Sequence, residues 1–423
     1  MWFFCAFFGI GKEKIIMNQT FMKERRIFPL VLSMALPMML SMAFSSLYNI
    51  VDSYFVAKLS EDAMTALSLV FPAQNLMTSV AVGFGVGINA MIAFYLGAGQ
   101  QKKANHAAAQ GLMFSVVHGL LIMALCLIGM PAFLGAFTSK QSVVDLGAEY
   151  SDIVFLFAVI VNVGITYEKI FQSVGRMKET MICMVIGFVA NIVLDPLLIF
   201  GVGFFPQMGI RGAAVATGIG QVLTLIAYIV FDKVKPLPVR INRESLNFDG
   251  EVCGRMYGIG IPATLNMALP SVLISALNGI LSVYSESYVL VLGVYYKLQT
   301  FIYLPANGII QGIRPLVGYN YGAGENRRVE KIYRLSLGMT ALLMAAGTVA
   351  CMAVPSQLMG LFSDSADTVS KGCTALRIIC LGFIVSSLSV TYSGTLEALG
   401  EGVPSLVISL LRYIVVIIPA AFI

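Results

Sequence analysis

Two aspartates, Asp52 and Asp195, lie inside long apolar stretches of the chain. An ionisable side chain in such a stretch is costly unless it faces protein or water, so it is a candidate for function. On a helix, Asn49 lies about one turn from Asp52, and Asn191 lies one turn from Asp195, which places each pair on a common face. Their oxygens could together hold a sodium ion, because hard cations favour carboxylate and amide ligands. Two neighbouring carboxylates could instead share a proton.

A purely structural role is open for each of these acids. Asp195 directly precedes Pro196 and could merely end a helix, and Asp52 could lie at the hydrated end of its helix. The adjacent residues Glu168 and Lys169 lie in another apolar stretch. We expect this acid and base to neutralise each other and to serve structure.

The carboxyl-terminal half has basic residues in its apolar stretches, namely Lys297, Arg314 and Arg412. They could pair with Glu397, line a cavity, or extend their charged ends to the membrane surface. If they lined a cavity, they would attract phosphate groups.

The composition predicts that these residues lie in an all-α integral membrane protein. The chain has 58% hydrophobic and 12% charged residues, against about 25% charged residues in soluble domains. Its mean hydropathy is +0.85. Apolar segments long enough to span a bilayer recur between short charged clusters. We expect eleven spans, near residues 28–56, 65–95, 108–134, 150–172, 181–203, 211–231, 257–281, 288–318, 335–361, 375–398 and 404–423.

The chain aligns with itself after a shift of 225 positions. Proline and glycine positions recur across some 140 residues without a gap: Pro37 falls on Pro262, Gly83 and Gly87 on Gly308 and Gly312, and Gly97 on Gly322. Repeats of this length in an apolar chain are typical of transporters. Six spans precede the linker, so both halves enter the membrane from the same side, related by a pseudo-two-fold axis along the membrane normal.

The repeat predicts a division of the chain into a segment 1–26, an amino-terminal lobe 27–232, a linker 233–254 and a carboxyl-terminal lobe 255–423. Under the same shift, the sixth span should recur beyond Ile423. We therefore expect a twelfth helix to be missing from this chain, the alternative being a protein of eleven spans. Met17 or Met22, just before a basic cluster, is the expected natural start.

Lysine and arginine are sorted between the loops of the two membrane sides. Eighteen lie on the side of the amino terminus and four on the other. The positive-inside rule then predicts a cytoplasmic amino terminus in the plasma membrane. The net charge of +5 follows from this sorting, so no nucleic-acid partner is expected. We expect a monomer in the lipid bilayer.

No catalytic dyad or clustered metal ligands are visible in the sequence, so an enzyme is not expected. The seven cysteines form no CxxC pair, and two histidines are too few for a metal site. The only expected bound species besides a substrate is the coupling ion, H⁺ or Na⁺.

The two halves differ at the polar positions of interest. Residues needed for packing should recur in both copies, whereas residues needed once should not. Asp52 aligns with Leu277, Asn191 with Val416, and Asp195 with Ala420. Pro37 lies on the helix of Asp52 and is an expected bending point, because proline removes a backbone hydrogen bond. Its recurrence as Pro262 favours a scaffold role first.

Three segments resemble the multidrug and toxic compound extrusion (MATE) family: ALPMMLSMAFSSLYNIVDSYFVAKL, AFYLGAGQQKKA with its repeat GYNYGAGENRR, and ANIVLDPLLIFG followed by GIRGAAVATGIGQ. The resemblance implies twelve helices in two six-helix lobes around a central cavity. It also implies export of cationic, amphipathic compounds in exchange for protons or sodium.

The family's site residues match Asp52, Asn191 and Asp195, and a threonine of the sixth helix falls near Thr217. One branch of the family also has acids in helices 7 and 10. This chain has no acid in helix 7 and none in helix 10 before Glu397, so it resembles the branch that couples through the amino-terminal lobe alone.

The expected function is an antiporter that expels drug-like organic cations by alternating access. The alternative is a flippase for lipid-linked precursors such as a polyprenyl pyrophosphate. Candidate residues of the substrate cavity are Tyr48, Gln74, Asn266 and Met267.

Overall fold

The computed structural model describes residues 19–203, 205–242, 244–360 and 365–422. Cys5 and the expected start at Met17 lie outside these ranges. Every element assigned within them is a helix. The first six spans are α3 (Ile27–Ala57), α4 (Glu61–Gly97), α5 (Gln101–Phe137), α6 (Gln141–Leu156) with α7 (Ala158–Ser173), α8 (Met177–Phe200) and α9 (Ile210–Val234).

The second half repeats this order after the linker, which contains the short helix η1 (Glu244–Leu246). Its spans are α10 (Gly250–Ser282), α11 (Glu286–Gly322), α12 (Asn326–Ala353), α14 (Ala366–Ile379) with α15 (Leu381–Leu399), and the run α16 (Gly402–Leu410), η2 (Leu411–Ile417) and α17 (Ile418–Ala420). Two short helices, α2 (Phe21–Glu24) and α13 (Pro355–Gly360), lie outside the spans.

The described residues contain nine helices long and apolar enough to cross a membrane, or eleven if each of two bent pairs is one span. Each of the eleven expected spans overlaps one of these. The fourth and tenth spans were expected to be continuous, but they bend by 48° between α6 and α7 and by 46° between α14 and α15. The two breaks, at Phe157 and Cys380, differ by two positions after the shift of 225, so the bend belongs to the repeat.

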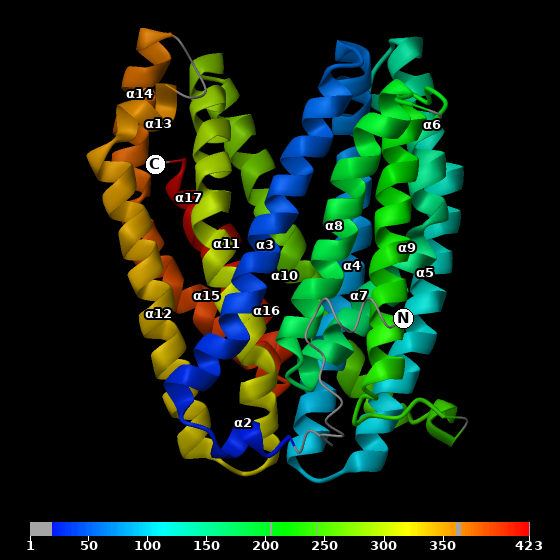
Figure 1. Cartoon of the computed structure of the whole chain (residues 1–423). Helices are drawn as coiled ribbons and strands as arrows, with labels where there is room; N and C mark the ends of the chain where they lie inside the picture. Colours follow the sequence, from blue (N-terminus) through cyan, green and yellow to red (C-terminus); the bar gives the residue numbers. More distant parts are fainter. Residues whose placement is uncertain (1–18, 204, 243, 361–364, 423) are drawn as a thin grey trace.

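Helices α3 to α9 form one lobe and α10 to α17 the other, side by side in Figure 1. The lobes come together at the end of the bundle that carries residues 98–100, 235–249 and 323–325, at the bottom of the view, and diverge toward the opposite end. We call these the linker end and the far end. The linker packs along α5 at the linker end, where the Gln110 side chain donates a hydrogen bond of 3.0 Å to the carbonyl of Asn247.

Paired glycines bring the lobes into backbone contact. A Cβ atom on Gly83 of α4 would lie 2.7 Å from the Cα of Thr264 in α10, and one on Gly308 of α11 would lie 2.7 Å from the Cα of Met39 in α3. These two contacts are copies of each other, since both partners are related by the shift of 225. Helices in membranes commonly approach through small residues in this way.

A second glycine pair repeats the pattern nearer the linker end. A Cβ atom on Gly97 would lie 2.0 Å from the Tyr319 carbonyl oxygen, and one on Gly322 would lie 2.1 Å from the Phe94 carbonyl oxygen. The glycines that revealed the repeat are therefore required by the contact between lobes.

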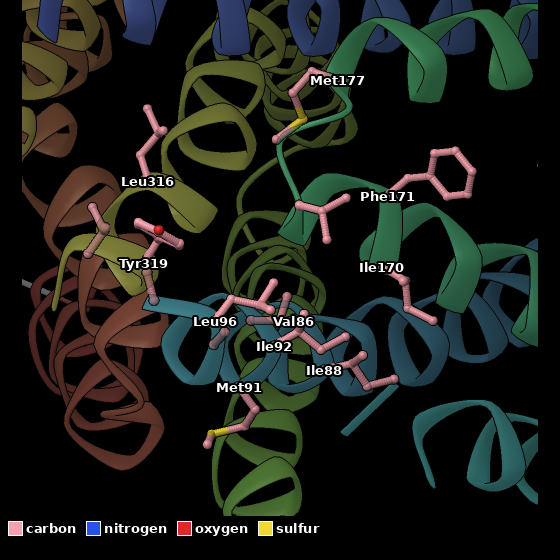
Figure 2. Close-up of a cluster of buried hydrophobic side chains, with 14 of the residues drawn as sticks. Val86, Ile88, Met91, Ile92, Leu96, Ile170, Phe171, Met177, Leu316 and Tyr319 are labelled. Atoms are coloured by element: carbon pink, nitrogen blue, oxygen red, sulfur yellow. The ribbon is translucent and has the colours of Figure 1, made fainter. Parts of the chain in front are cut away.

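An apolar core surrounds these contacts and crosses the boundary between lobes. Figure 2 shows Val86, Ile92 and Leu96 along α4, with Tyr319 of α11 beside the Leu96 end, and these side chains belong to one buried cluster. Met22 of α2 joins this cluster and is fully buried, and its carbonyl oxygen accepts hydrogen bonds from α11 and α12. The linker end is thus closed by side-chain packing as well as by glycine contacts.

Helix α3 continues without a break through Pro37. The Ser41 hydroxyl donates a hydrogen bond of 2.9 Å to the Pro37 carbonyl oxygen. A bending role for Pro37 stays a prediction.

We expect Gly97→Ala to lower the thermal midpoint of the purified protein, because the new methyl group would overlap the Tyr319 carbonyl oxygen. Overpacking of this kind costs about 1–3 kcal/mol. Gly338→Ala is the matched control, since a Cβ atom there meets no atom within 4 Å. Equal midpoints for the two variants in one detergent would show that the glycine contact is not needed.

Candidate functional site

Close packing of α8 against α9 positions the centre of the site. A Cβ atom on Gly187 would lie 2.7 Å from the Gly220 carbonyl oxygen, and one on Gly220 would lie 2.8 Å from the Gly187 carbonyl oxygen. The two helices can therefore approach until short polar side chains meet between them. Asn191 lies one turn beyond Gly187 on α8, and Thr217 lies one turn from Gly220 on α9.

Asn191 joins Asp195 to Thr217. With its nitrogen turned toward the carboxylate, the Asn191 amide donates a hydrogen bond of 3.0 Å to Asp195 Oδ2. Its oxygen then accepts from the Thr217 backbone nitrogen at 3.1 Å and from the Thr217 hydroxyl at 3.3 Å. This orientation satisfies both ends of the amide. Asp195 is fully buried and Asn191 is 2% exposed, so Asp195 is an interior group.

Asp52 reaches the same region from α3, which packs against α8. Its side chain is buried, and Oδ1 has no hydrogen-bond partner among the described residues. Asp52 and Asp195 lie close enough to interact electrostatically, and Tyr48 interacts with both. Two buried carboxylates with an unpaired oxygen are suited to binding a cation or sharing a proton. The structure thus joins Asn191, Asp195 and Thr217 by hydrogen bonds and places Asp52 close enough to Asp195 to interact with it electrostatically.

Asn49 does not belong to this cluster. Its side chain is exposed, and its amide donates a hydrogen bond of 2.8 Å to the Ser45 carbonyl on its own helix. Successive residues of a helix are separated by about 100° around its axis. The face of α3 turned toward α8 carries Ser41, Tyr48 and Asp52, and Asn49 has turned away from it. The expectation that Asn49 supplies a ligand is therefore wrong for this structure.

A cavity of about 330 Å³ adjoins the cluster on the linker-end side. Its wall comes mainly from α3, α4, α7, α8 and α9, so it lies within the amino-terminal lobe. The other lobe contributes Met267 and Gln311. Asn191 and Thr217 are shared between cavity and cluster, whereas the two aspartates are not among the lining residues.

Of the four residues expected in the substrate cavity, Tyr48 and Met267 line it. The Tyr48 ring stacks on Phe188, with centroids 5.2 Å apart and an angle of 9° between the planes. Tyr48 therefore provides an aromatic surface between the cavity and the acids. Phe188 carried no signal in the sequence, because phenylalanine is frequent throughout this apolar chain.

Gln74 and Asn266 do not line the cavity, contrary to expectation. The Gln74 amide donates a hydrogen bond of 3.4 Å to the Tyr150 hydroxyl, and Tyr150 itself interacts electrostatically with Asp52. Asn266 donates to Glu397 at 3.2 Å, inside the other lobe. Both amides form hydrogen bonds with polar side chains outside the cavity lining, and the sequence could not reveal these partners.

Two basic residues of the carboxyl-terminal lobe, Arg314 and Arg412, find partners within that lobe. Arg314 forms a buried ion pair of 2.8 Å with Glu397, which was one of the open alternatives. Arg412 donates a hydrogen bond of 2.9 Å to the Ser389 hydroxyl. Neither arginine lines the cavity described above.

Glu168 and Lys169 form the expected ion pair, with a distance of 2.7 Å. Both line the cavity, toward the linker end, together with Gln311. The sequence predicted the pairing but not this location, because the register of α7 against its neighbours is a tertiary property.

Comparisons with known proteins agree with this architecture. A multidrug export protein, MepA, from Staphylococcus aureus strain MSSA476 is 25% identical over 404 residues, which cover 95% of this chain and 88% of that protein. A MOP superfamily transporter from Pyrococcus furiosus, described as having a binding pocket of reverse polarity that suggests a different function, has a TM-score of 0.89 at 25% identity. That match covers 97% of this chain and 91% of the other.

A multidrug resistance MATE family transporter, described in an outward-facing conformation, also has a TM-score of 0.89, at 24% identity. That match covers 96% of this chain and 90% of the other chain. The MatE family model matches residues 37–197 and again residues 262–423, one match for each half of the repeat. The chain belongs to the MatE family of transporters.

Proposed function

We propose that this protein is a secondary active multidrug efflux antiporter. It exports cationic, amphipathic organic compounds in exchange for H⁺ or Na⁺ by alternating access. The observation that carries the proposal is the buried cluster of Asp52, Asn191, Asp195 and Thr217 beside a cavity in the same lobe. The substrate class is supported by the name of the Staphylococcus aureus relative, a multidrug export protein.

The cluster offers a physical basis for ion coupling. Asp52 Oδ1 lacks a hydrogen-bond partner among the described residues, and unpaired buried polar atoms are costly. A bound proton or sodium ion would relieve this cost. An ion can drive transport only if it binds the two access states differently. Because Asp52 and Asp195 lie on different helices, a shift of α3 against α8 would change the site and its ion affinity.

The cavity lining suits varied organic cations. Met38, Met42, Met184 and Met267 contribute flexible thioether side chains, and Tyr48 contributes an aromatic face. Methionine adapts to ligands of different shape, and aromatic faces attract organic cations. Tyr48 would therefore place a cationic substrate next to the ion site.

We place the linker end in the cytoplasm of a cell whose plasma membrane holds the protein as a monomer. This orientation rests on the sorting of lysine and arginine between the loops. With this orientation the lobes are closed toward the cytoplasm and diverge toward the outside. The structure would then represent an outward-facing state.

The alternative function, a lipid-linked precursor flippase, would be favoured if Lys297, Arg314 and Arg412 lined a cationic cavity, but none of the three lines the cavity described above. Arg314 is instead neutralised by Glu397, and Arg412 points to Ser389. These contacts favour the antiporter.

Asp195→Asn and Asp52→Asn should each lower ion-driven efflux of ethidium by at least about tenfold, within the usual range of coupling between sites. Each substitution removes a charge from the cluster while keeping its size. Efflux is measured in cells that hold equal amounts of each variant in the membrane. Asn49→Ala is the control on the same helix, because Asn49 lies outside the cluster. Undiminished efflux by the Asp195→Asn variant would refute the assignment.

The coupling ion can be identified in everted vesicles with the proton and sodium gradients imposed one at a time. We expect ethidium uptake with an acidic or a sodium-rich interior, and we expect the responsive gradient to lose its effect in the Asp52→Asn variant. Uptake without either gradient, at the same rate, would rule out antiport.

Gly187→Ala should reduce efflux strongly, because its methyl group would push α8 away from α9 and separate Asn191 from Thr217. The matched variant is Gly164→Ala in the same cavity wall, where a Cβ atom meets nothing within 4 Å. We expect that variant to transport nearly as well as the unchanged protein. Similar loss in both would mean that helix spacing is not the cause.

A further inference from the structure

The floor of the cavity holds one acid and one base. Glu168 and Lys169 are the only charged residues in the lining formed by the described part of the chain. Their side chains are 12% and 2% exposed, so solvent screens them little. A cationic substrate in the cavity would meet Glu168 as its nearest acidic partner in the wall, and that partner is already paired.

Lys169 is held by residues of both lobes. Its ammonium group donates to Glu168 Oε1 at 2.7 Å, to Gln172 Oε1 at 3.2 Å and to Gln311 Oε1 at 3.4 Å. The Gln172 amide donates to the same Glu168 oxygen at 2.8 Å. Glu168 and Gln172 lie with Lys169 on α7, whereas Gln311 lies on α11 of the other lobe. The full set of three acceptors therefore exists only when the lobes are together.

The internal repeat shows that packing does not require the charge. The Lys169 stem lies over Gly85 of α4, where a Cβ atom would be 2.7 Å from Lys169 Cγ. At the equivalent place in the other half, Ile310 of α11 lies over Gly394 of α15, where a Cβ atom would be 2.3 Å from Ile310 Cγ2. The shift of 225 relates Gly85 to Ile310 and Lys169 to Gly394. The carboxyl-terminal half fills this space with an isoleucine side chain, and the amino-terminal half fills it with a lysine side chain.

A buried ion pair is weak evidence for stability, because removing two charges from water costs about as much as their attraction returns. Since isoleucine fills the equivalent space in the other half, the ammonium group of Lys169 needs another explanation. Charged residues buried within spans usually serve transport itself.

We propose that Lys169 is a built-in cation that competes with the transported cation for Glu168 and expels it when the linker end closes. This inference rests on the proposed function. When the linker end is closed, Lys169 forms an ion pair with Glu168, so the cavity floor offers no free acidic partner to the transported cation. Lys169 thus acts as a positioning residue, which sets when Glu168 can bind a substrate.

Contact between the lobes makes this competition depend on conformation. Gln311 lies between Gly308 and Gly312, and Cβ atoms on these glycines would lie 2.7 Å from Met39 Cα and 2.6 Å from Ala35 Cα in α3. Opening the linker end must separate α11 from α3 and withdraw Gln311 from Lys169. Lys169 then has one acceptor fewer, so an incoming cation can displace it from Glu168. Closing restores Gln311 and reverses the exchange.

The test compares Lys169→Met with Lys169→Arg in the purified full chain in lipid nanodiscs, with ethidium as the cationic probe. Methionine keeps a long stem but removes the charge. We expect the Lys169→Met variant to bind ethidium about tenfold more tightly, within the range of typical coupling energies. In vesicles its KM should fall and its maximal export rate should fall as well, because release is slowed. Lys169→Arg should restore values near those of the unchanged protein.

Two further measurements separate charge competition from a change of cavity shape. Nile red, a neutral dye, should bind the Lys169→Met and Lys169→Arg variants with equal affinity. Adding Glu168→Gln to Lys169→Met should remove the gain in ethidium affinity. Gln311→Met leaves the ion pair in place and should tighten ethidium binding by a smaller factor, which keeps the test available if Lys169→Met does not fold. In that case the Gln311→Met variant is decisive, and an unchanged ethidium affinity of this variant overturns the proposal.

The proposal is overturned if the unchanged protein binds ethidium but the Lys169→Met variant binds it no more tightly, or if Nile red gains as much affinity. Failure of the unchanged protein to bind or export any organic cation is a different result. It would refute the proposed function and this inference with it.

Discussion

Backbone contact between the two lobes at the linker end is the constraint on which the other features depend. In a bilayer, helices gain little from burying apolar side chains against one another, so close approach through small residues contributes much of their association. Gly308 and Gly312 bring α11 against α3, which in turn sets Gln311 beside Lys169 and closes the cavity floor. The same principle, applied through Gly187 and Gly220, sets the spacing of α8 and α9 and hence the contact of Asn191 with Thr217.

The scaffold is symmetric, but its chemistry is confined to one half. The glycine contacts recur in both lobes, and so do the bends between α6 and α7 and between α14 and α15. After the shift of 225, the acids Asp52 and Asp195 align with the apolar residues Leu277 and Ala420 of the other half. That half has its own buried ion pair, Arg314 with Glu397, and neither residue lines the cavity. A repeated frame is thus combined with polar residues in one lobe, at which we propose that an ion binds.

Much of the fold was predictable, because each span is an apolar run of the length that a bilayer requires and each copy of the repeat checks the other. Asp52, Asn191 and Asp195 could be found for a related reason: a polar group within a span, absent from the second copy, is seldom explained by packing. Prediction failed where a neighbouring helix decided the outcome. Asn49 shares a turn with Asp52 but faces away from α8. Gln74 and Asn266 bond to Tyr150 and Glu397 instead of lining the cavity.

The sequence by itself determined the class of protein, the spans, the repeat and the polar residues that set one half apart, because these follow from hydrophobic length and from identity between copies. Only the tertiary structure decided which polar residues meet. Helix rotation and depth depend on side chains from helices far apart in the chain, such as Gly85 beneath Lys169 and Gln311 across the boundary between lobes. For this reason the pairing of Glu168 with Lys169 could be expected from their adjacency, whereas their place on the floor of the cavity could not.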